Sequence, residues 1–156
     1  MSEFCASCGL EIAGGGTACN QVFLEQVARS SGDFRLGLLQ RFMVDVYALQ
    51  HPDRYCESAK SFAAHLTGLC CAMEFNSAQS VHVAILRWLN GASPVERPVP
   101  PAARGQLTIA EIRAAAPDAY ETALRRWAAS TWAAYEPLHG TARHWIGTAL
   151  ARAGQR

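Results

Sequence analysis

The N-terminal segment holds three cysteines whose spacing suits a metal ion. Cys5 and Cys8 form a Cys-x-x-Cys turn followed by Gly9, and Cys19 comes soon after a glycine run. Such a turn lets two sulfurs approach one zinc ion at about 2.3 Å, and glycine permits the backbone conformation that points amide N–H groups at the sulfurs. A third thiolate can then close on the same ion. The sequence predicts a bound zinc ion with Cys5, Cys8 and Cys19 among its ligands.

The fourth ligand must come from elsewhere in the chain. Our first choice is His51, because Pro52 disfavours helical geometry at the residue before it and so ends a helix there. Cys56 and His65 are the alternatives. We expect a closed site with four protein ligands, because three thiolates quench the Lewis acidity that a hydrolase would exploit. The other use of these thiols, a redox dithiol, normally needs a helix N-terminus after a strand, and no strand is predicted.

A second set of candidates lies within the expected helices. His65 and His139 both fall on faces that the apolar spacing predicts to be buried, and Arg143 follows His139 on the same face. Asp45 is expected to pair with Arg41, four residues earlier, and its alternative role is to orient a histidine or help bind a metal. Together, Asp45, His65, His139 and Arg143 are our candidates for an internal polar pocket that binds a small molecule.

Three functional hypotheses follow. The first is a zinc-binding helical protein with a structural Cys3His site and the internal pocket. The second is a metal-dependent enzyme of hydrolase or lyase type, in which His65 or His139 carries a proton. The third is a protein-interaction module. The sequence contains no glycine-rich phosphate loop after a strand, no Gly-x-Ser-x-Gly and no His-Glu-x-x-His, which argues against the large nucleotide-binding and hydrolase classes.

Composition limits the remaining possibilities. The chain has 156 residues, 50% of them hydrophobic and 17% charged, which is ordinary for one globular domain. A formal net charge of +1 with interspersed signs does not favour a nucleic-acid partner. The sequence lacks a secretory signal and a long apolar run, so we expect a cytoplasmic protein without a membrane segment. In a reducing compartment the six cysteines are metal ligands or packed thiols rather than disulfides.

The apolar spacing is helical nearly throughout, which predicts an all-α, single-domain bundle of about six helices with an N-terminal zinc-knuckle-like segment. The segment at 33–50 is hydrophobic on all sides and should form a central helix, whereas a proline-rich stretch should form an extended connector. The expected helices span 20–30, 33–50, 57–75, 77–90, 117–135 and 140–152, and a further short helix begins at the capping box of Thr108 to Glu111 and is interrupted by Pro117. The expected organisation is a metal-binding segment at 1–19, a first half of the core at 20–90, the connector at 91–105 and a second half at 106–156.

Several motifs together resemble an uncharacterised bacterial family known only as a domain of unknown function. The resemblance covers nearly the whole chain, and Tyr-x-x-Gln-His-Pro is its most specific part. It implies that Cys5, Cys8, Cys19 and His51 belong to the recurring set. Relatives often carry histidine a few residues before Asp45, where this chain has Gln40 and Arg41. The motifs are Cys5-x-x-Cys8-Gly9, Cys19, the run from Asp45 to Pro52, His65-Leu66, Trp127 to Trp132, and His139-x-x-x-Arg143-x-Trp145.

Overall fold

The computed structural model of the chain describes residues 3–92 and 94–155. Within these residues the regular structure is helical, apart from one isolated antiparallel bridge between Phe4 and Glu11. The predicted all-α class is therefore confirmed, as is a bundle built on six helices of seven or more residues in the described part of the chain. These are α1 (Gly15–Ser31), α3 (Gln40–Gln50), α5 (Ala59–Glu74), α6 (Gln79–Asn90), α8 (Tyr120–Ala134) and α9 (His139–Ala153).

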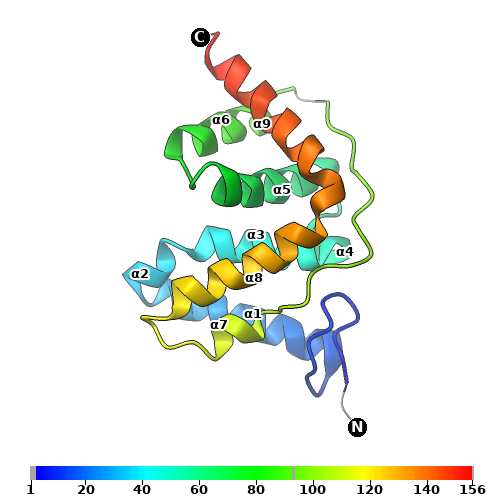
Figure 1. Cartoon of the computed structure of the whole chain (residues 1–156), viewed down its shortest axis with the longest axis vertical. Helices are drawn as coiled ribbons and strands as arrows, with labels where there is room; N and C mark the ends of the chain where they lie inside the picture. Colours follow the sequence, from blue (N-terminus) through cyan, green and yellow to red (C-terminus); the bar gives the residue numbers. More distant parts are fainter. Residues whose placement is uncertain (1–2, 93, 156) are drawn as a thin grey trace.

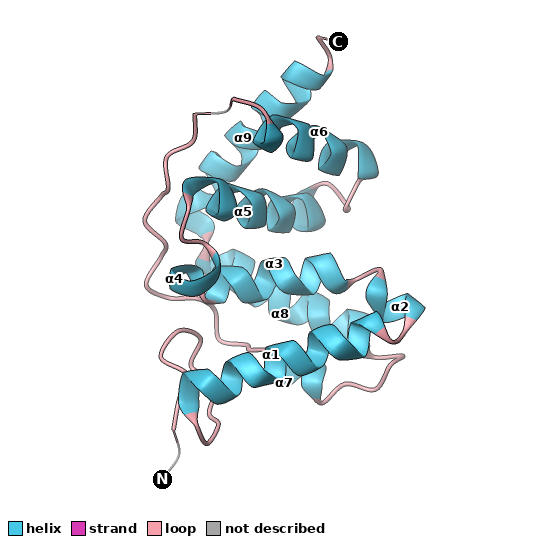
Figure 2. Cartoon of the chain, turned by 180° about the vertical axis from the view of Figure 1, so that it is seen from behind, coloured by secondary structure: helices cyan, strands magenta, loops and turns pink. Residues whose placement is uncertain are grey.

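The helices stack in layers around α3 (Figure 1). Helix α3 packs against α5 on one side and against α1 on the other, and α8 lies beside it. Helices α5, α6 and α9 form the part of the bundle farthest from the N-terminus. Seen from behind, α1 crosses below α3, and the N-terminal loops lie next to the start of α1 (Figure 2). The side chains of α3 are buried on nearly every side, as expected for a central helix.

The helix expected over 33–50 is divided in two, and that expectation was wrong in extent. Asp33 caps a single turn, α2 (Phe34–Gly37), by accepting hydrogen bonds from the N–H groups of Arg35 and Leu36. The chain then turns through Leu38 before α3 begins. Phe34 and Leu38, which belong to the segment expected to form a central helix, are 82% and 71% exposed. The cap favours an early, separate turn, which rotates these two side chains away from the core.

Helix α1 begins at Gly15 instead of Asn20, so Cys19 lies within a helix and not in the preceding loop. Gly14 has a left-handed φ of 93°, and its N–H donates to Glu3 Oε2 at 2.6 Å. Asn20, the first residue of the helix expected over 20–30, instead lies within α1, and its Oδ1 accepts a hydrogen bond from Tyr55 Oη at 2.5 Å. The glycine run thus reverses the chain and opens the helix.

Short elements and a long connector complete the bundle. Helix α4 (Pro52–Tyr55) follows α3 directly, α7 (Ala110–Arg113) precedes α8, and the 3-10 turn η1 (Glu136–Leu138) links α8 to α9. Between α6 and α7 the chain runs down the side of the molecule without helix (Figure 1). Buried Gln50 holds this connector by donating from Nε2 to the carbonyls of Arg104 and Leu107, at 2.9 and 2.8 Å.

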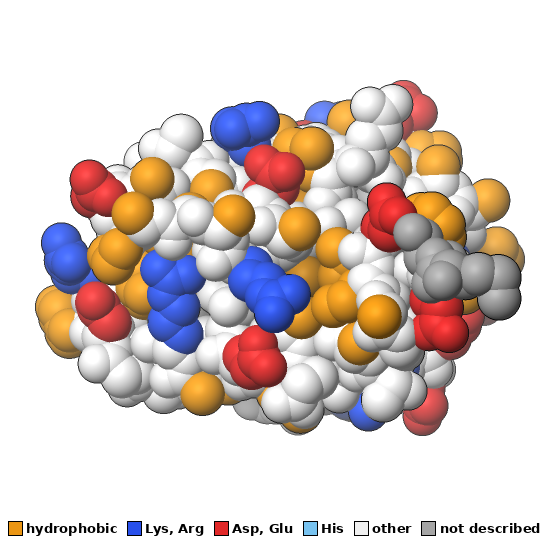
Figure 3. Space-filling model, turned by 90° about the horizontal axis from the view of Figure 1, so that it is seen from below, with side chains coloured by type: hydrophobic (Ala, Val, Ile, Leu, Met, Phe, Trp, Pro, Cys, Tyr) orange, Lys and Arg blue, Asp and Glu red, His pale blue; other side chains and the backbone are white. Residues whose placement is uncertain are grey.

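The surface carries charges of both signs. On the face that includes the N-terminal segment, basic and acidic side chains are interspersed with apolar ones (Figure 3). Within residues 3–92 and 94–155, none of the helices has both the length and the apolar character needed to cross a bilayer.

Candidate metal centre

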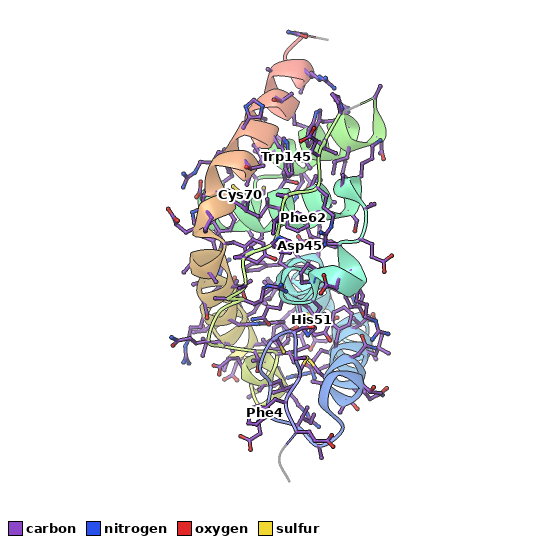
Figure 4. The ribbon with its side chains drawn as sticks, turned by 90° about the vertical axis from the view of Figure 1, so that its right-hand side faces the viewer. Phe4, Asp45, His51, Phe62, Cys70 and Trp145 are labelled. Carbon is purple, nitrogen blue, oxygen red and sulfur yellow. The ribbon has the colours of Figure 1, made fainter. Side chains whose placement is uncertain are left out.

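Four side chains converge where the N-terminal segment meets the end of α3. The ligand atoms of Cys5, Cys8, Cys19 and His51 all lie within 4.8 Å of one another. All four residues are buried, Cys19 completely. They come from three parts of the chain: the N-terminal turn, the second turn of α1 and the C-terminal cap of α3. Figure 4 shows His51 on the side of α3 that faces the N-terminal segment.

The separations of these atoms match the edges of a zinc tetrahedron. Bond lengths of about 2.3 Å to sulfur and 2.0 Å to nitrogen give sulfur–sulfur edges of about 3.8 Å and sulfur–nitrogen edges of about 3.5 Å. The Sγ atoms of Cys8 and Cys19 are 3.7 Å apart. His51 Nε2 lies 3.5 Å from the sulfurs of both Cys5 and Cys19. The group therefore has the donors and the spacing for one tetrahedral metal ion.

The N-terminal turn is shaped by its backbone. Gly9 N–H donates to Cys5 O at 2.8 Å, and Cys5 N–H donates to Leu10 O at 2.8 Å. Gly9 has a φ of +79°, in the left-handed region that glycine adopts without steric cost. The Leu10 backbone donates a hydrogen bond to the Cys8 sulfur, which favours the thiolate. This arrangement is the knuckle expected from a Cys-x-x-Cys-Gly sequence.

His51 is oriented by the helix that carries it. Its Nδ1 donates to the carbonyl oxygen of Tyr47 at 2.8 Å, which leaves the lone pair of Nε2 directed at the sulfurs. The imidazole also stacks on the Tyr47 ring, with centroids 3.9 Å apart, and Tyr47 stacks in turn on Phe23. Pro52 forms the first turn of α4, so the helix ends at His51 as the sequence predicts.

The electrostatics of the cluster favour one thiolate before any metal is considered. The pKa of Cys19 is lowered, chiefly by its hydrogen bond with Cys8 and further by the one with Tyr47. The same contact raises the pKa of Cys8, because Cys8 is the proton donor of the pair. Binding of a divalent cation would release the protons of the other cysteine ligands, since coordinated cysteines are deprotonated.

The alternative ligands lie elsewhere. Cys56 is buried beside α3 and its thiol donates to the carbonyl of Ala48, and burial raises its pKa to about 12. His65 pairs with Asp45. The redox reading loses the helix N-terminus that it needs, because Cys5 and Cys8 both precede α1. All six cysteines are free thiols in this structure.

The candidates for an internal pocket separate into two groups. His65 Nδ1 donates to Asp45 Oδ1 at 2.9 Å, so Asp45 orients a histidine and does not form the expected ion pair with Arg41. The expectation that Arg143 faces inward was wrong. Its exposed guanidinium donates two hydrogen bonds to Glu74, at 2.8 and 2.7 Å. His139 stacks on Trp132 and donates to its carbonyl at 2.8 Å.

Three residues beside the cluster or beside Asp45 were not predicted from the sequence. Tyr47 contacts Cys19 through its hydroxyl at 3.5 Å, and its place one turn before His51 is the signal that could have revealed it. Gly68 lies in the middle of α5, where glycine weakens a helix and so indicates close packing. His82 lies in a pocket with Asp45 on the other side of α3. No sequence pattern links these two residues.

Comparison with known proteins adds a family but no activity. The model of a family described as a family of unknown function (DUF5946) matches residues 3–136, and the chain belongs to this family. The match includes all four residues of the cluster. No curated protein and no solved structure matches the chain.

Proposed function

We propose that Cys5, Cys8, Cys19 and His51 bind one zinc ion in a closed site that fastens the N-terminal segment to the helical bundle. The observation that carries this proposal is the agreement between the donor separations in the structure and the edges of a zinc tetrahedron. Burial of all four donors and the fixed Nε2 of His51 support it further. Zinc is favoured over harder cations because three of the four donors are sulfur.

The role of such an ion is structural. A structural zinc site has four protein ligands, whereas a catalytic site keeps one position for water or substrate. The four donors here come from segments far apart in the sequence, so their binding energy holds the N-terminal turn, α1 and α3 together. The small segment before α1 has few apolar side chains of its own to bury, and Phe4 is 60% exposed. The ion supplies the cohesion that this segment lacks.

Metal analysis of the purified chain tests the proposal. We expect about one zinc ion per chain in the native protein and loss of most of the metal in Cys19→Ser and His51→Ala. Cys70→Ala is the matched control for the first, because Cys70 is equally buried but outside the cluster. His144→Ala, at an exposed position of α9, is the control for the second. Full zinc content in both cluster variants would contradict the site.

A second candidate function, a metal-dependent hydrolase or lyase, is favoured by one observation. A surface pocket of about 420 Å³ lies over the cluster, lined in part by Cys5, His51 and Asp53. A substrate entering it would approach the metal from the His51 side. His65 and His139 are not among the residues that line this pocket, so Asp53 would be the proton carrier there. A zinc ion with a bound water, in place of four protein ligands, is the result that favours this candidate.

A further inference from the structure

A second site lies on the opposite side of α3 from the metal cluster. A pocket of about 250 Å³ opens between α3, the α5–α6 turn and α6. Figure 4 shows Asp45 on the side of α3 that faces α5, away from His51. Asp45 is only 4% exposed, yet it lines this pocket. A buried carboxylate at the floor of a cavity needs a reason, because burial without compensation is costly.

The carboxylate is held with one oxygen paired and one oxygen free. His65 Nδ1 binds Oδ1 at 2.9 Å. Oδ2 lies over Gly68, where an added Cβ would come within 2.8 Å of Asp45 Cγ and closer still to Oδ2. Within the described part of the chain no group donates a hydrogen bond to Oδ2. Gly68 therefore makes room for an oxygen that retains its capacity to accept a hydrogen bond.

The surroundings of this oxygen are also short of partners. His82 Nδ1 is buried without a hydrogen-bond partner among residues 3–92 and 94–155. Burial lowers the pKa of His82, which favours the neutral ring, and burial raises the pKa of Asp45. Native proteins satisfy nearly all such buried groups, so an unpartnered nitrogen beside a pocket is available to a ligand, an ion or water. An ammonium group reaching Asp45 would supply both the missing donor and the missing positive charge.

A cation and an apolar surface complete the pocket. Arg41, one turn before Asp45 on α3, lines it and has no hydrogen bond or ion pair with any described residue. Residues four apart on a helix have Cβ atoms about 5–6 Å apart, a spacing that an amino acid's ammonium and carboxylate groups can bridge. Leu38, Phe42 and Leu86 line the same pocket, and Leu38 and Leu86 are exposed.

The backbone at the rim is unusual as well. Asn76 and Ser77, in the turn between α5 and α6, both have left-handed φ values, of 50° and 52°. A positive φ is uncommon for residues other than glycine, and such backbone conformations recur at functional sites. The turn places Ser77 and Gln79 among the lining residues, opposite Arg41 and Asp45 on α3.

We infer that this pocket binds a small zwitterion of the α-amino acid class with an apolar side chain. The ammonium group binds Asp45 Oδ2, the carboxylate binds Arg41, and the side chain packs on Leu38 and Leu86. The volume suits a metabolite of this size, because pockets for drug-sized ligands begin at about 300 Å³. His65 is a positioning residue, since it fixes Oδ1 and so directs Oδ2 at the ligand.

Calorimetric titration of the full-length, zinc-replete protein with L-leucine tests the inference. We expect saturable binding, weakened about tenfold or more when the carboxylate is removed in leucinamide or the ammonium in 4-methylpentanoate. Glycine, which lacks the apolar side chain, should also bind more weakly. Equal affinity for leucine and 4-methylpentanoate would overturn the assignment. So would the absence of any heat of binding when leucine is in roughly tenfold excess over protein at about 1 mM.

Variants locate the binding in this pocket. Asp45→Asn and Arg41→Gln should each weaken leucine binding by about tenfold or more, and Arg41→Gln should not weaken leucinamide further. Arg126→Gln, at an exposed arginine outside the pocket, is the matched control. Arg41 is exposed, so its variant tests the inference even if Asp45→Asn fails to fold. Unchanged affinity in Arg41→Gln would contradict the site. Zinc content, measured in each variant, shows whether a loss of leucine binding occurs while the proposed zinc site is intact.

Discussion

The two sides of α3 carry polar groups that are organised in opposite ways. At its C-terminal end, the donor atoms of three thiols and an imidazole lie at separations that match the edges of a tetrahedron. One and a half turns earlier, Asp45 keeps one oxygen without a donor, and Arg41 and the buried nitrogen of His82 also lack partners among the described residues. The first arrangement has the donors for one metal ion, and we propose that this ion stabilises the fold. The second leaves polar groups without partners beside a pocket, which is the basis of the proposed binding site.

The difference also explains how each region depends on glycine. In the N-terminal turn, Gly9 provides a backbone conformation that brings the two sulfurs together. On α5, Gly68 provides space, because any side chain there would collide with the Asp45 carboxylate. Gly9 therefore shapes the turn that carries two of the cluster's cysteines, and Gly68 leaves space for the Asp45 carboxylate.

The largest effect should follow removal of the metal ligands. We expect Cys19→Ser to lower the free energy of unfolding by about 4 kcal/mol when zinc is present at a thousandfold its dissociation constant, since binding to the folded state alone contributes that amount. Cys70→Ala, which removes a packed thiol, should cost about 1 kcal/mol. Urea unfolding with and without a chelator measures both. If a chelator leaves the free energy of unfolding of the native protein unchanged, the cluster does not stabilise the fold through a bound metal.

A smaller effect should follow Gly68→Ala. The new Cβ forces Asp45 or the packing of α3 on α5 to shift, and overpacking of this kind costs about 1–3 kcal/mol. Zinc content should remain at the native value, because the metal centre lies on the other side of α3. Combining Gly68→Ala with Asp45→Ala should cost less than the sum of the single changes, since truncation of Asp45 removes the collision. Strict additivity in this double-mutant cycle would contradict the contact.

Thiol labelling should divide the cysteines into two classes without any mutation. In the zinc-bound protein all six thiols should resist alkylation. After chelation at pH 8, mass spectrometry should find a label on Cys19 within about the first tenth of the time needed for Cys56 and Cys70, because the pKa of Cys19 is lowered. Burial raises the pKa of Cys56 and of Cys70 to about 12, so both remain protonated and unreactive. Labelling of Cys56 before Cys19 would contradict the prediction that the Cys19 thiol is the more reactive of the two.

The smallest effect concerns pH. Burial raises the pKa of Asp45, against the opposing influence of His65, Arg41 and His82, so the folded state holds this proton more tightly than the unfolded state. Above the ordinary aspartate pKa of about 3.9 the unfolded chain binds fewer protons, and native stability should fall as pH rises toward the elevated value. Asp45→Asn should lack this decline, which amounts to about 1.4 kcal/mol for each unit of pKa elevation. A constant difference between the two proteins from pH 3 to pH 7 would show that no such elevation exists.

The sequence predicted the metal centre better than the pocket, for a physical reason. Zinc ligands are few residue types at short spacings, and a proline after a histidine marks a helix end, so Cys5, Cys8, Cys19 and His51 could be selected together. The helical class likewise follows from apolar periodicity. The pocket depends on how α3, α5 and α6 pack, and nothing local to His82 or Gly68 indicates that both lie beside Asp45.

The wrong expectations have the same origin. The helix expected over 33–50 is divided because Asp33 caps a separate first turn, a local signal that the continuous hydrophobic pattern of this segment obscures. The helical spacing puts Arg143 in line with buried residues of α9, but its side chain pairs with Glu74 at the surface, where the charge keeps its hydration and avoids the cost of burial.

X-ray absorption at the zinc edge is the measurement that tests the central claim most directly. A closed site requires a first shell of three sulfur atoms near 2.3 Å and one nitrogen near 2.0 Å, with no oxygen ligand. His51→Ala should replace the nitrogen by an oxygen or lose the metal. A native spectrum with two sulfurs, or with a bound water, would contradict a structural Cys3His centre and place the chemistry of this protein at the metal.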